Sequence, residues 1–221
     1  MTTKEQRTEI FKSFQQQIKK ESTFETGKQD LLKLREELLA VYDFIFDNCE
    51  LEDFSKIPLR TDKTIAYYLY HLLRIEDMTS NTLIKGTTQI FFADGFDKKL
   101  NSPIITTGNE LHRDELVEFS KTLNIDELKK YAHTVIKNTN KIISEMDFAK
   151  SKTKISEEKK ASLINLRTVS TAETAGWLVG YWCNKTYTGL FLMPHSRHHM
   201  LHLNGCLRIM DALGRADYKR S

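Results

Sequence analysis

The sequence predicts an all-α protein: an up-down bundle of four long helices, with an additional short N-terminal helix and loop insertions. Apolar residues recur at spacings of three and four in almost every window, which is the period of a helix with one buried face. Nine Gly and three Pro are too few for the frequent turns of a β-sandwich. The segments 89–93 and 103–107 are the only candidate strands, and neither pattern is convincing.

Two apolar stripes predict the first two helices. The first stripe is short and covers residues 10–18, and Thr2 and Glu5 before it have the spacing of a capping box. The second stripe covers residues 31–45, and we expect its helix to end near Cys49.

A third helix is expected between a loop and an irregular region. The segment 50–60 contains a proline and is predicted to be a loop, after which Thr61 is the expected N-cap. Gly86 is suited to end this helix, because glycine readily adopts the left-handed conformation found after helices. Glycines and an Asn-Ser-Pro sequence interrupt residues 87–112, so we expect a loop there with at most a short helical turn.

The fourth predicted helix begins after Asn124, which forms a capping box with Glu127. Its apolar stripe extends to about Asp147. The charged stretch Lys150–Lys160 that follows is predicted to be an exposed loop or flap.

The C-terminal part of the sequence predicts two more helices, and the first of them precedes the histidine-rich one. Ser170 and Glu173 have capping-box spacing and open a helix that contains both tryptophans. The segment 184–194 resembles an insertion that breaks the pattern. A final helix is expected from about Pro194 to about Leu213, with a glycine behind it as the stop.

Composition excludes several classes of protein. With 33 basic and 30 acidic residues the net charge is +3, which gives no electrostatic case for binding nucleic acid. Three widely spaced Cys argue against a disulfide framework and favour a reducing compartment. No apolar run is long enough for a membrane span or suited to a signal peptide. We therefore expect one cytoplasmic domain over residues 1–221.

Four of the seven histidines lie within eight residues, and this run is the most distinctive feature of the sequence. On a helical wheel, His195 and His202 fall about 40° and 60° from His199 and continue the apolar stripe of the last helix. His198 lies about 100° away from His199, off that stripe. Burying several imidazoles is costly unless each has a partner, and one shared metal ion satisfies several at once.

Spacing limits which of these histidines can share an ion. His195 and His202 are about 10 Å apart along the helix axis. The feasible pairs are His195 with His199, His198 with His202, and His199 with His202. We choose the first pair, because it alone places two rings at i, i+4 near the centre of the stripe.

A third ligand must come from another helix. His71 borders the apolar stripe of the third helix, whereas His112 falls in a loop-like stretch and His133 on a lysine-rich, solvated face. The predicted metal ligands are therefore His71, His195 and His199, which leave an open coordination position as in catalytic zinc sites. A hydrogen-bonded network of core histidines and an exposed cluster stay open as alternatives.

These motifs resemble the DinB-like (YfiT-like) family of four-helix metalloproteins. Its members have one His late in the second bundle helix, which Tyr70-His71-Leu72-Leu73 matches. They also have a His-x-x-His-His-x-x-His run in the last helix, which residues 195–202 match without a gap. The resemblance covers about 61–86 and 194–214 by motif, and it implies the same three ligands: His71, His195 and His199.

The resemblance also implies a function. Relatives include transferases that use low-molecular-weight thiols, and others are described as metal-dependent hydrolases. We therefore expect a divalent ion, Zn²⁺ or alternatively Ni²⁺, that holds a thiolate for attack on a small electrophile. His202 is the candidate for a base outside the ligand set, or equally for a core histidine. Tyr68 and Trp182 are candidates to line the pocket.

Two other functions remain compatible with the sequence. A metal-bound hydroxide could hydrolyse a small ester or amide, although no carboxylate base is evident near the histidine run. The chain could also be a non-catalytic bundle with a structural ion or a histidine network. The expected partner is a small molecule, with neither nucleic acid nor membrane, and a homodimer is indicated by the resemblance alone.

Overall fold

The structure is a computed structural model that describes residues 2–58 and 61–215. Helices dominate these residues, and no β-strand occurs among them, since Lys154 and Thr186 form only an isolated bridge. The α-helices are α1 (Lys4–Gln17), α2 (Phe24–Asn48), α3 (Ile65–Asp77), α4 (Ile90–Ala93), α5 (Phe96–Lys99), α6 (Arg113–Thr122), α7 (Ile125–Ser144), α8 (Phe148–Ser151), α9 (Glu157–Asn165), α10 (Glu173–Cys183), α11 (Tyr187–Leu192) and α12 (His198–Ala212). The 3₁₀ turns are Glu21–Thr23 and Leu51–Ser55, and the π-helical segments are Met78–Lys85 and Met193–Arg197.

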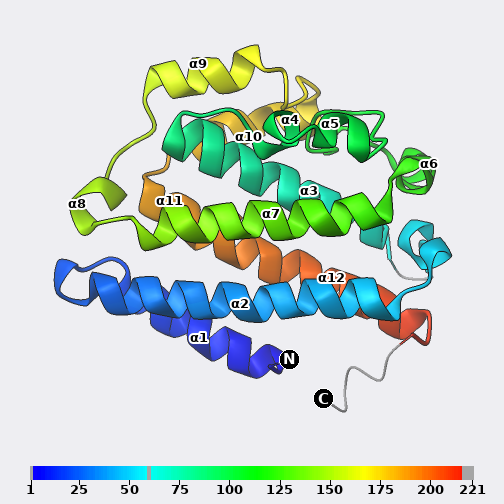
Figure 1. Ribbon diagram of the computed structural model, residues 1–221, viewed down its shortest axis with the longest axis horizontal. Coiled ribbons are helices and arrows are strands. Elements are labelled where there is room, and N and C mark those ends of the chain that lie inside the picture. The colour runs from blue at the N-terminus through cyan, green and yellow to red at the C-terminus, as the bar shows by residue number, and fades with distance from the viewer. Residues whose placement is uncertain (1, 59–60, 216–221) are drawn as a thin grey trace.

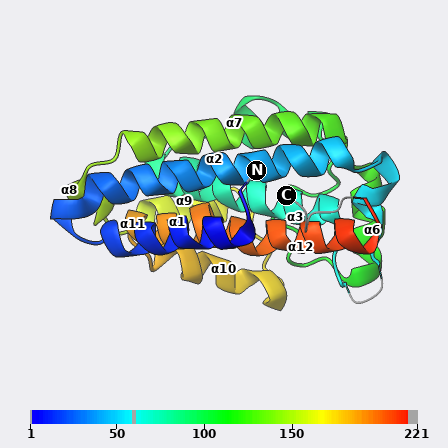
Figure 2. The same ribbon diagram turned by 90° about the horizontal axis from the view of Figure 1, so that it is seen from below.

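Four helices surround the main core. Helix α2 packs against α7 and α12, and α3 packs against the same two helices, so each of the four has two neighbours (Figure 1). Helix α1 packs along α2 outside this group. Helices α9 and α10 lie on the α3 side of the molecule, and Figure 2 shows α10 at the edge that faces away from α7. The all-helical prediction is confirmed.

The two π-helical segments continue α-helices. Met78–Lys85 extends α3, and the left-handed Gly86 (φ +72°) ends it, as the sequence predicted. Met193–Arg197 joins α11 to α12, so residues 187–212 form one nearly continuous helical run. The predicted break at 184–194 is therefore limited to residues 184–186, between α10 and α11. Pro194 does not interrupt the run, because it lies in the first turn of the π-segment, where a missing N–H is tolerated.

Several helix starts differ from the prediction. The capping box of α1 is formed by Thr3 and Gln6, one residue later than expected. The N-cap of α3 is Thr64 rather than Thr61, because the Thr64 side chain accepts from the N–H of Tyr67 and is buried against Ser120. At α10 the N-cap is Ala172, and its side chain makes no capping bond.

The charged stretch Lys150–Lys160 also differs, because it contains the end of α8 and the start of α9. Ser156 caps α9, two glutamates lie in its first turn, and Leu163 is its buried anchor. Helix α6 was not predicted either. By contrast, α2 ends at Cys49, Asn124 caps α7, and Gly214 follows α12, as expected.

Among the described residues, every helix is too short or too polar to cross a lipid bilayer.

Candidate metal centre

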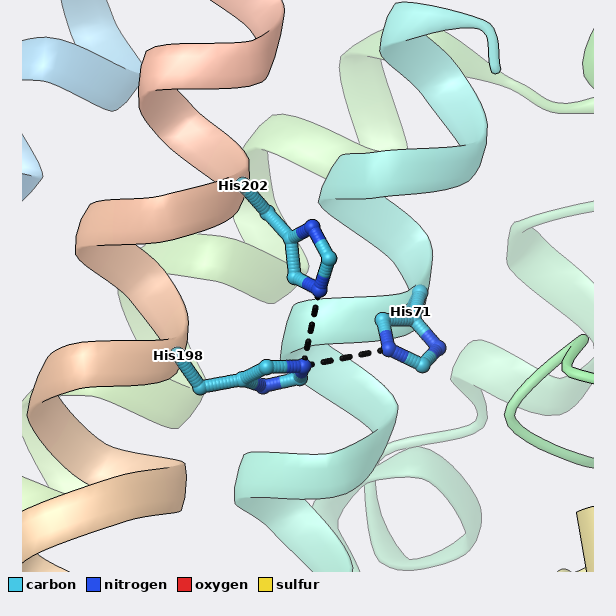
Figure 3. A group of neighbouring side chains, drawn as sticks. All are labelled: His71, His198 and His202. Atoms are coloured by element: carbon cyan, nitrogen blue, oxygen red, sulfur yellow. Dashed lines mark hydrogen bonds between the residues drawn. The ribbon is translucent and has the colours of Figure 1, made fainter. Parts of the chain in front are cut away.

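Three histidines from two helices converge on one point. His71 projects from α3, and His198 and His202 project from one face of α12 at i, i+4 (Figure 3). Nε2 of His198 lies 3.2 Å from Nε2 of His71 and 2.9 Å from Nε2 of His202. One ring nitrogen of each residue lies within 4.8 Å of the other two. We call these three residues the outer histidine group.

Hydrogen bonding alone does not satisfy this arrangement. Nδ1 of His71 lies 2.9 Å from the carbonyl oxygen of Thr107, which can only accept, so Nδ1 carries the proton and Nε2 of His71 is a lone pair. Nε2 of His198 has at most one proton to share between two close nitrogens. A cation would accept a lone pair from all three rings. Two nitrogens bound to one tetrahedral zinc ion lie roughly 3.3 Å apart, close to the spacings observed here.

The environment keeps these imidazoles neutral. Burial lowers the pKa of His71 to about 4 and that of His202 to about 3, and it lowers the pKa of His198 well below its ordinary value. The nearby histidines lower the pKa of each further. Neutral imidazole is the form that binds metal ions, so near pH 7 the group could hold one.

Neighbouring rings fix the orientation of the group. Tyr67 stacks on His71 with centroids 5.5 Å apart, and Tyr68 stacks on His202 at 4.9 Å. Gly205 allows the second contact, because a Cβ there would lie 3.0 Å from the Tyr68 ring. The carbonyl of Thr107 holds the His71 tautomer, as the hydrogen-bond partners of metal-binding histidines commonly do.

A pocket of about 530 Å³ opens beside the outer histidine group. All three histidines line it, as do Tyr68 and Trp182, which the sequence had suggested for this role. A larger cleft of about 910 Å³ lies between the Leu51–Ser55 turn and α6, but no histidine lines it. The chemistry therefore favours the smaller pocket as the functional one.

The predicted ligands divide between two places. His71 lies in the outer histidine group, but His195 and His199 do not. Nε2 of His195 lies 2.8 Å from Oγ1 of Thr79 and 3.2 Å from Oγ of Ser80. The structure thus brings His71 together with His198 and His202, rather than with the two residues chosen from the sequence.

Two physical reasons explain the difference. His195 lies in the π-helical segment Met193–Arg197, whose wider turn changes the angular position that a regular wheel assigns. The wheel also placed the site at the centre of the apolar stripe, whereas the outer histidine group lies at its edge, where the pocket opens. The i, i+4 pair of His198 and His202 had been among the feasible pairs. His202, considered as a base outside the ligand set, is a member of the group itself.

The two predicted ligands outside the outer histidine group, His195 and His199, belong to a second, buried assembly, which we call the inner network. It consists of Arg35, Tyr42, Glu76, His195 and His199. The hydroxyl of Tyr42 lies 3.1 Å from Nδ1 of His199, and Oε2 of Glu76 lies 2.7 Å from Nε2 of the same ring. Arg35 binds Oε1 of Glu76 at 2.5 Å and the carbonyl oxygen of His195 at 2.7 Å.

Charge pairing stabilises the ionised carboxylate of the inner network. Burial alone would raise the pKa of Glu76, but Arg35 and His199 lower it below its ordinary value. Only a weak signal for this pair is present in the sequence, since Arg35 and Glu76 lie next to apolar stripes. Their contact spans 41 positions of the chain, so no local pattern could reveal it. Glu76 also supplies a carboxylate near the histidine run that the sequence did not show.

Comparison with known proteins adds no name to this site. No protein-family model matches the chain, and a search of curated proteins finds no match.

Proposed function

We propose that this chain is a metal-dependent enzyme built on a DinB-like four-helix bundle, with His71, His198 and His202 as the ligands of a divalent ion. The most favoured ion is Zn²⁺, with Ni²⁺ as the alternative, because neutral imidazoles suit both. The observation that carries the proposal is the convergence of three neutral imidazoles at a pocket wall. Three protein ligands leave room for a substrate ligand, the pattern of catalytic rather than structural zinc sites.

The favoured reaction is transfer of a low-molecular-weight thiol to a small electrophile. A bound divalent ion would lower the pKa of the thiol and supply a thiolate at neutral pH. The chain's own residues then have three tasks: His71 is held in one tautomer by Thr107, the tyrosines keep the rings in place, and the pocket positions the electrophile.

Hydrolysis is the second candidate reaction, and the position of Asp62 in the pocket favours it. This exposed carboxylate lines the same pocket as the outer histidine group, so it could accept a proton from an attacking water. Glu76 does not line the pocket and is occupied by Arg35. The two reactions differ in one requirement, since only the transferase needs an added thiol.

The ligand assignment is tested with a matched pair of variants, His198→Ala and His199→Ala. The two positions are adjacent on α12, yet only the first belongs to the outer histidine group. After loading with Zn²⁺ and desalting, we expect about one ion per chain for the wild type and for His199→Ala, and at least a tenfold loss of affinity for His198→Ala. His133→Ala, which removes a surface ring paired with Asp43, is the control.

Circular dichroism would show that each variant is folded, and His198→Gln provides a second test if alanine is not tolerated. Equal zinc content in the wild type and both His198 variants would contradict the assignment. Turnover of an aryl halide with and without added thiol, and of a nitrophenyl ester without thiol, then separates transfer from hydrolysis. Activity on the ester alone would reject the transferase in favour of the second candidate.

A further inference from the structure

We propose that the pocket beside the outer histidine group binds a planar aromatic molecule that carries a carboxylate. Trp177 and Tyr181 of α10 would form the surface for the ring, and Lys63 would be the partner of the carboxylate. This inference deepens the proposed function, on which it rests, by naming the class of substrate.

The first observation is an exposed aromatic pair on α10. Trp177 is 54 % exposed and Tyr181 is 38 % exposed, although both line the pocket. They are four positions apart on one helix face and meet edge to face, with ring centroids 5.6 Å apart. Large aromatic side chains left exposed at a pocket are typical of ligand-binding surfaces.

The second observation is a facing aromatic wall from α3. The rings of Tyr67 and Tyr68 lie 6.0 Å apart, line the same pocket and stack on two histidines of the outer group. The pocket therefore has aromatic side chains on both sides, from α3 and from α10. Flat rings gain most from such surfaces, because stacking requires a planar partner.

The two phenols also offer donors to a ligand. Neither hydroxyl forms a hydrogen bond within the described ranges 2–58 and 61–215. A phenol has an ordinary pKa of about 10, so both hydroxyls carry their protons near pH 7. A hydroxyl that keeps its proton can donate to a carboxylate oxygen.

The third observation concerns charge. The ammonium group of Lys63 lies 5.1 Å from the centroid of the Tyr67 ring, and Lys63 lines the pocket. The three neutral histidines would leave the full charge of a bound dication in place. Asp62 is the opposing charge, but it is exposed, so solvent screens it. One fixed cation with neutral donors suits a singly charged carboxylate.

The volume of the pocket agrees with this class of ligand. About 530 Å³ lies within the range of small-molecule sites, roughly 300–1,000 Å³. A substituted benzene ring with one carboxylate fits such a space and leaves part of it for a second substrate.

Three probes separate the contributions of ring and charge: benzoate, cyclohexanecarboxylate and benzyl alcohol. Binding is measured by calorimetry on the full chain, both with Zn²⁺ and after chelation. Benzoate is expected to bind about tenfold more tightly than either other probe, in the chelated protein as well, since the ring surface and Lys63 do not depend on the ion.

Matched variants identify the residues responsible. Trp177→Ala should weaken benzoate binding by about fivefold, whereas Trp177→Phe should retain it, because a ring remains. Lys63→Gln should weaken benzoate by a similar factor but leave benzyl alcohol unchanged. Leu201→Ala, which trims an apolar residue that is 50 % exposed and does not line the pocket, is the control.

Failure of this inference is distinguishable from failure of the proposed function. If Zn²⁺ binds in a His198-dependent way but benzoate binds no better than cyclohexanecarboxylate, the substrate class is wrong and the metal site stands. If no Zn²⁺ binds, the proposed function fails, and benzoate binding to the metal-free protein still decides the inference. If Trp177→Ala alters only the oligomeric state, measured by light scattering, the aromatic pair is a protein contact and the inference is overturned.

Discussion

The outer histidine group and the inner network share the helices α3 and α12, yet their chemistry differs. On α12, His198 and His202 face the pocket, whereas His199 faces Glu76 and Tyr42. On α3, His71 belongs to the first assembly and Glu76 to the second. In the inner network, Nδ1 of His199 and Nε2 of His195 each have a hydroxyl partner, and Nε2 of His199 lies 2.7 Å from the Glu76 carboxylate. Nδ1 of His195 has no hydrogen-bond partner among the described residues. In the outer group the Nε2 atoms meet one another.

This difference is the basis on which we propose the outer group as the metal site, because the partners of a buried histidine differ between the two assemblies, whereas buried histidines occur in both. A ring that has a carboxylate or a hydroxyl beside it has less need of a cation. Three rings whose nitrogens converge with no carboxylate among them could hold one. The inner network should therefore control stability and the outer group metal binding, and four predictions test that division.

The largest effect is expected when the inner ion pair is broken by Arg35→Met. Both partners are fully or nearly fully buried, so the Glu76 carboxylate would be left charged and unpaired. We expect a loss of about 3–5 kcal/mol in the free energy of unfolding, measured by urea denaturation. Lys129→Met, which breaks an exposed pair with Asp47, should cost less than about 1 kcal/mol. Equal losses in the two variants would contradict a stabilising role for the inner network.

The second effect concerns stabilisation by metal. At free Zn²⁺ 100 times above its Kd, the native state should gain about 2.7 kcal/mol, seen as a rise in the urea midpoint. His202→Ala removes one of three ligands and should abolish most of this gain. His195→Ala should retain the gain although it lowers stability without metal, because it removes a buried ring and one hydrogen-bond partner of the Thr79 and Ser80 hydroxyls. Loss of the gain in His195→Ala would mean that the two assemblies are not separate.

The third effect is a dependence of metal-free stability on pH, to which both assemblies contribute. Burial lowers the pKa of His71 from 6.5 to about 4 and that of His195 from 6.5 to about 3. The unfolded chain therefore binds protons first, and stability that is present above pH 6.5 is lost as the pH falls toward 4. Each such histidine contributes up to about 1.4 kcal/mol per pH unit.

His71→Phe and His195→Phe should each reduce the slope of unfolding free energy against pH by the contribution of one histidine, up to about 1.4 kcal/mol per pH unit. The slope is measured by urea denaturation between pH 7.5 and 4.5. His71→Phe changes the outer group and His195→Phe the inner network, so the pair compares the two regions directly. A slope that matches the wild type in both variants would mean that neither ring is held neutral.

Much of the fold could be predicted from the sequence, because the apolar residues of a half-buried helix recur at spacings of three and four. The apolar stripes located α2, α7 and α12, and Gly86 marked an end, since only a residue tolerant of φ +72° fits there. Helix starts were less predictable, because several threonines and serines compete to be the N-cap. Thr64 prevails over Thr61 through a tertiary contact with Ser120 that no local pattern contains.

The candidate site was predicted in part for a similar reason. The histidine run and His71 pointed to the two helices that meet, but the choice among the histidines needed the helix phase. The π-helical segment Met193–Arg197 alters that phase through its hydrogen-bond register, which leaves no periodic signature in the sequence. The partners of His199 come from α2 and α3, so its role depends on packing rather than on spacing.

The smallest effect is expected for Tyr42→Phe, which removes one hydroxyl from the inner network. The Glu76 carboxylate beside Nε2 of His199 can only accept, which favours the tautomer in which Nδ1 accepts the proton of the Tyr42 hydroxyl. The proton of that ring then lies on Nε2, 2.7 Å from the Glu76 carboxylate. Loss of the hydroxyl should cost about 1 kcal/mol in urea denaturation and leave zinc content unchanged.

Tyr68→Phe is the matched control in the outer region. Its ring stacks on His202, but its hydroxyl has no hydrogen-bond partner in the part of the chain that the structure describes, so its removal should barely change stability. If Tyr42→Phe lowers zinc affinity as much as stability, the tautomer of His199 influences its neighbour His198 through the helix. The inner network and the outer histidine group would then not have separate roles, because one hydroxyl on α2 would affect both stability and metal binding.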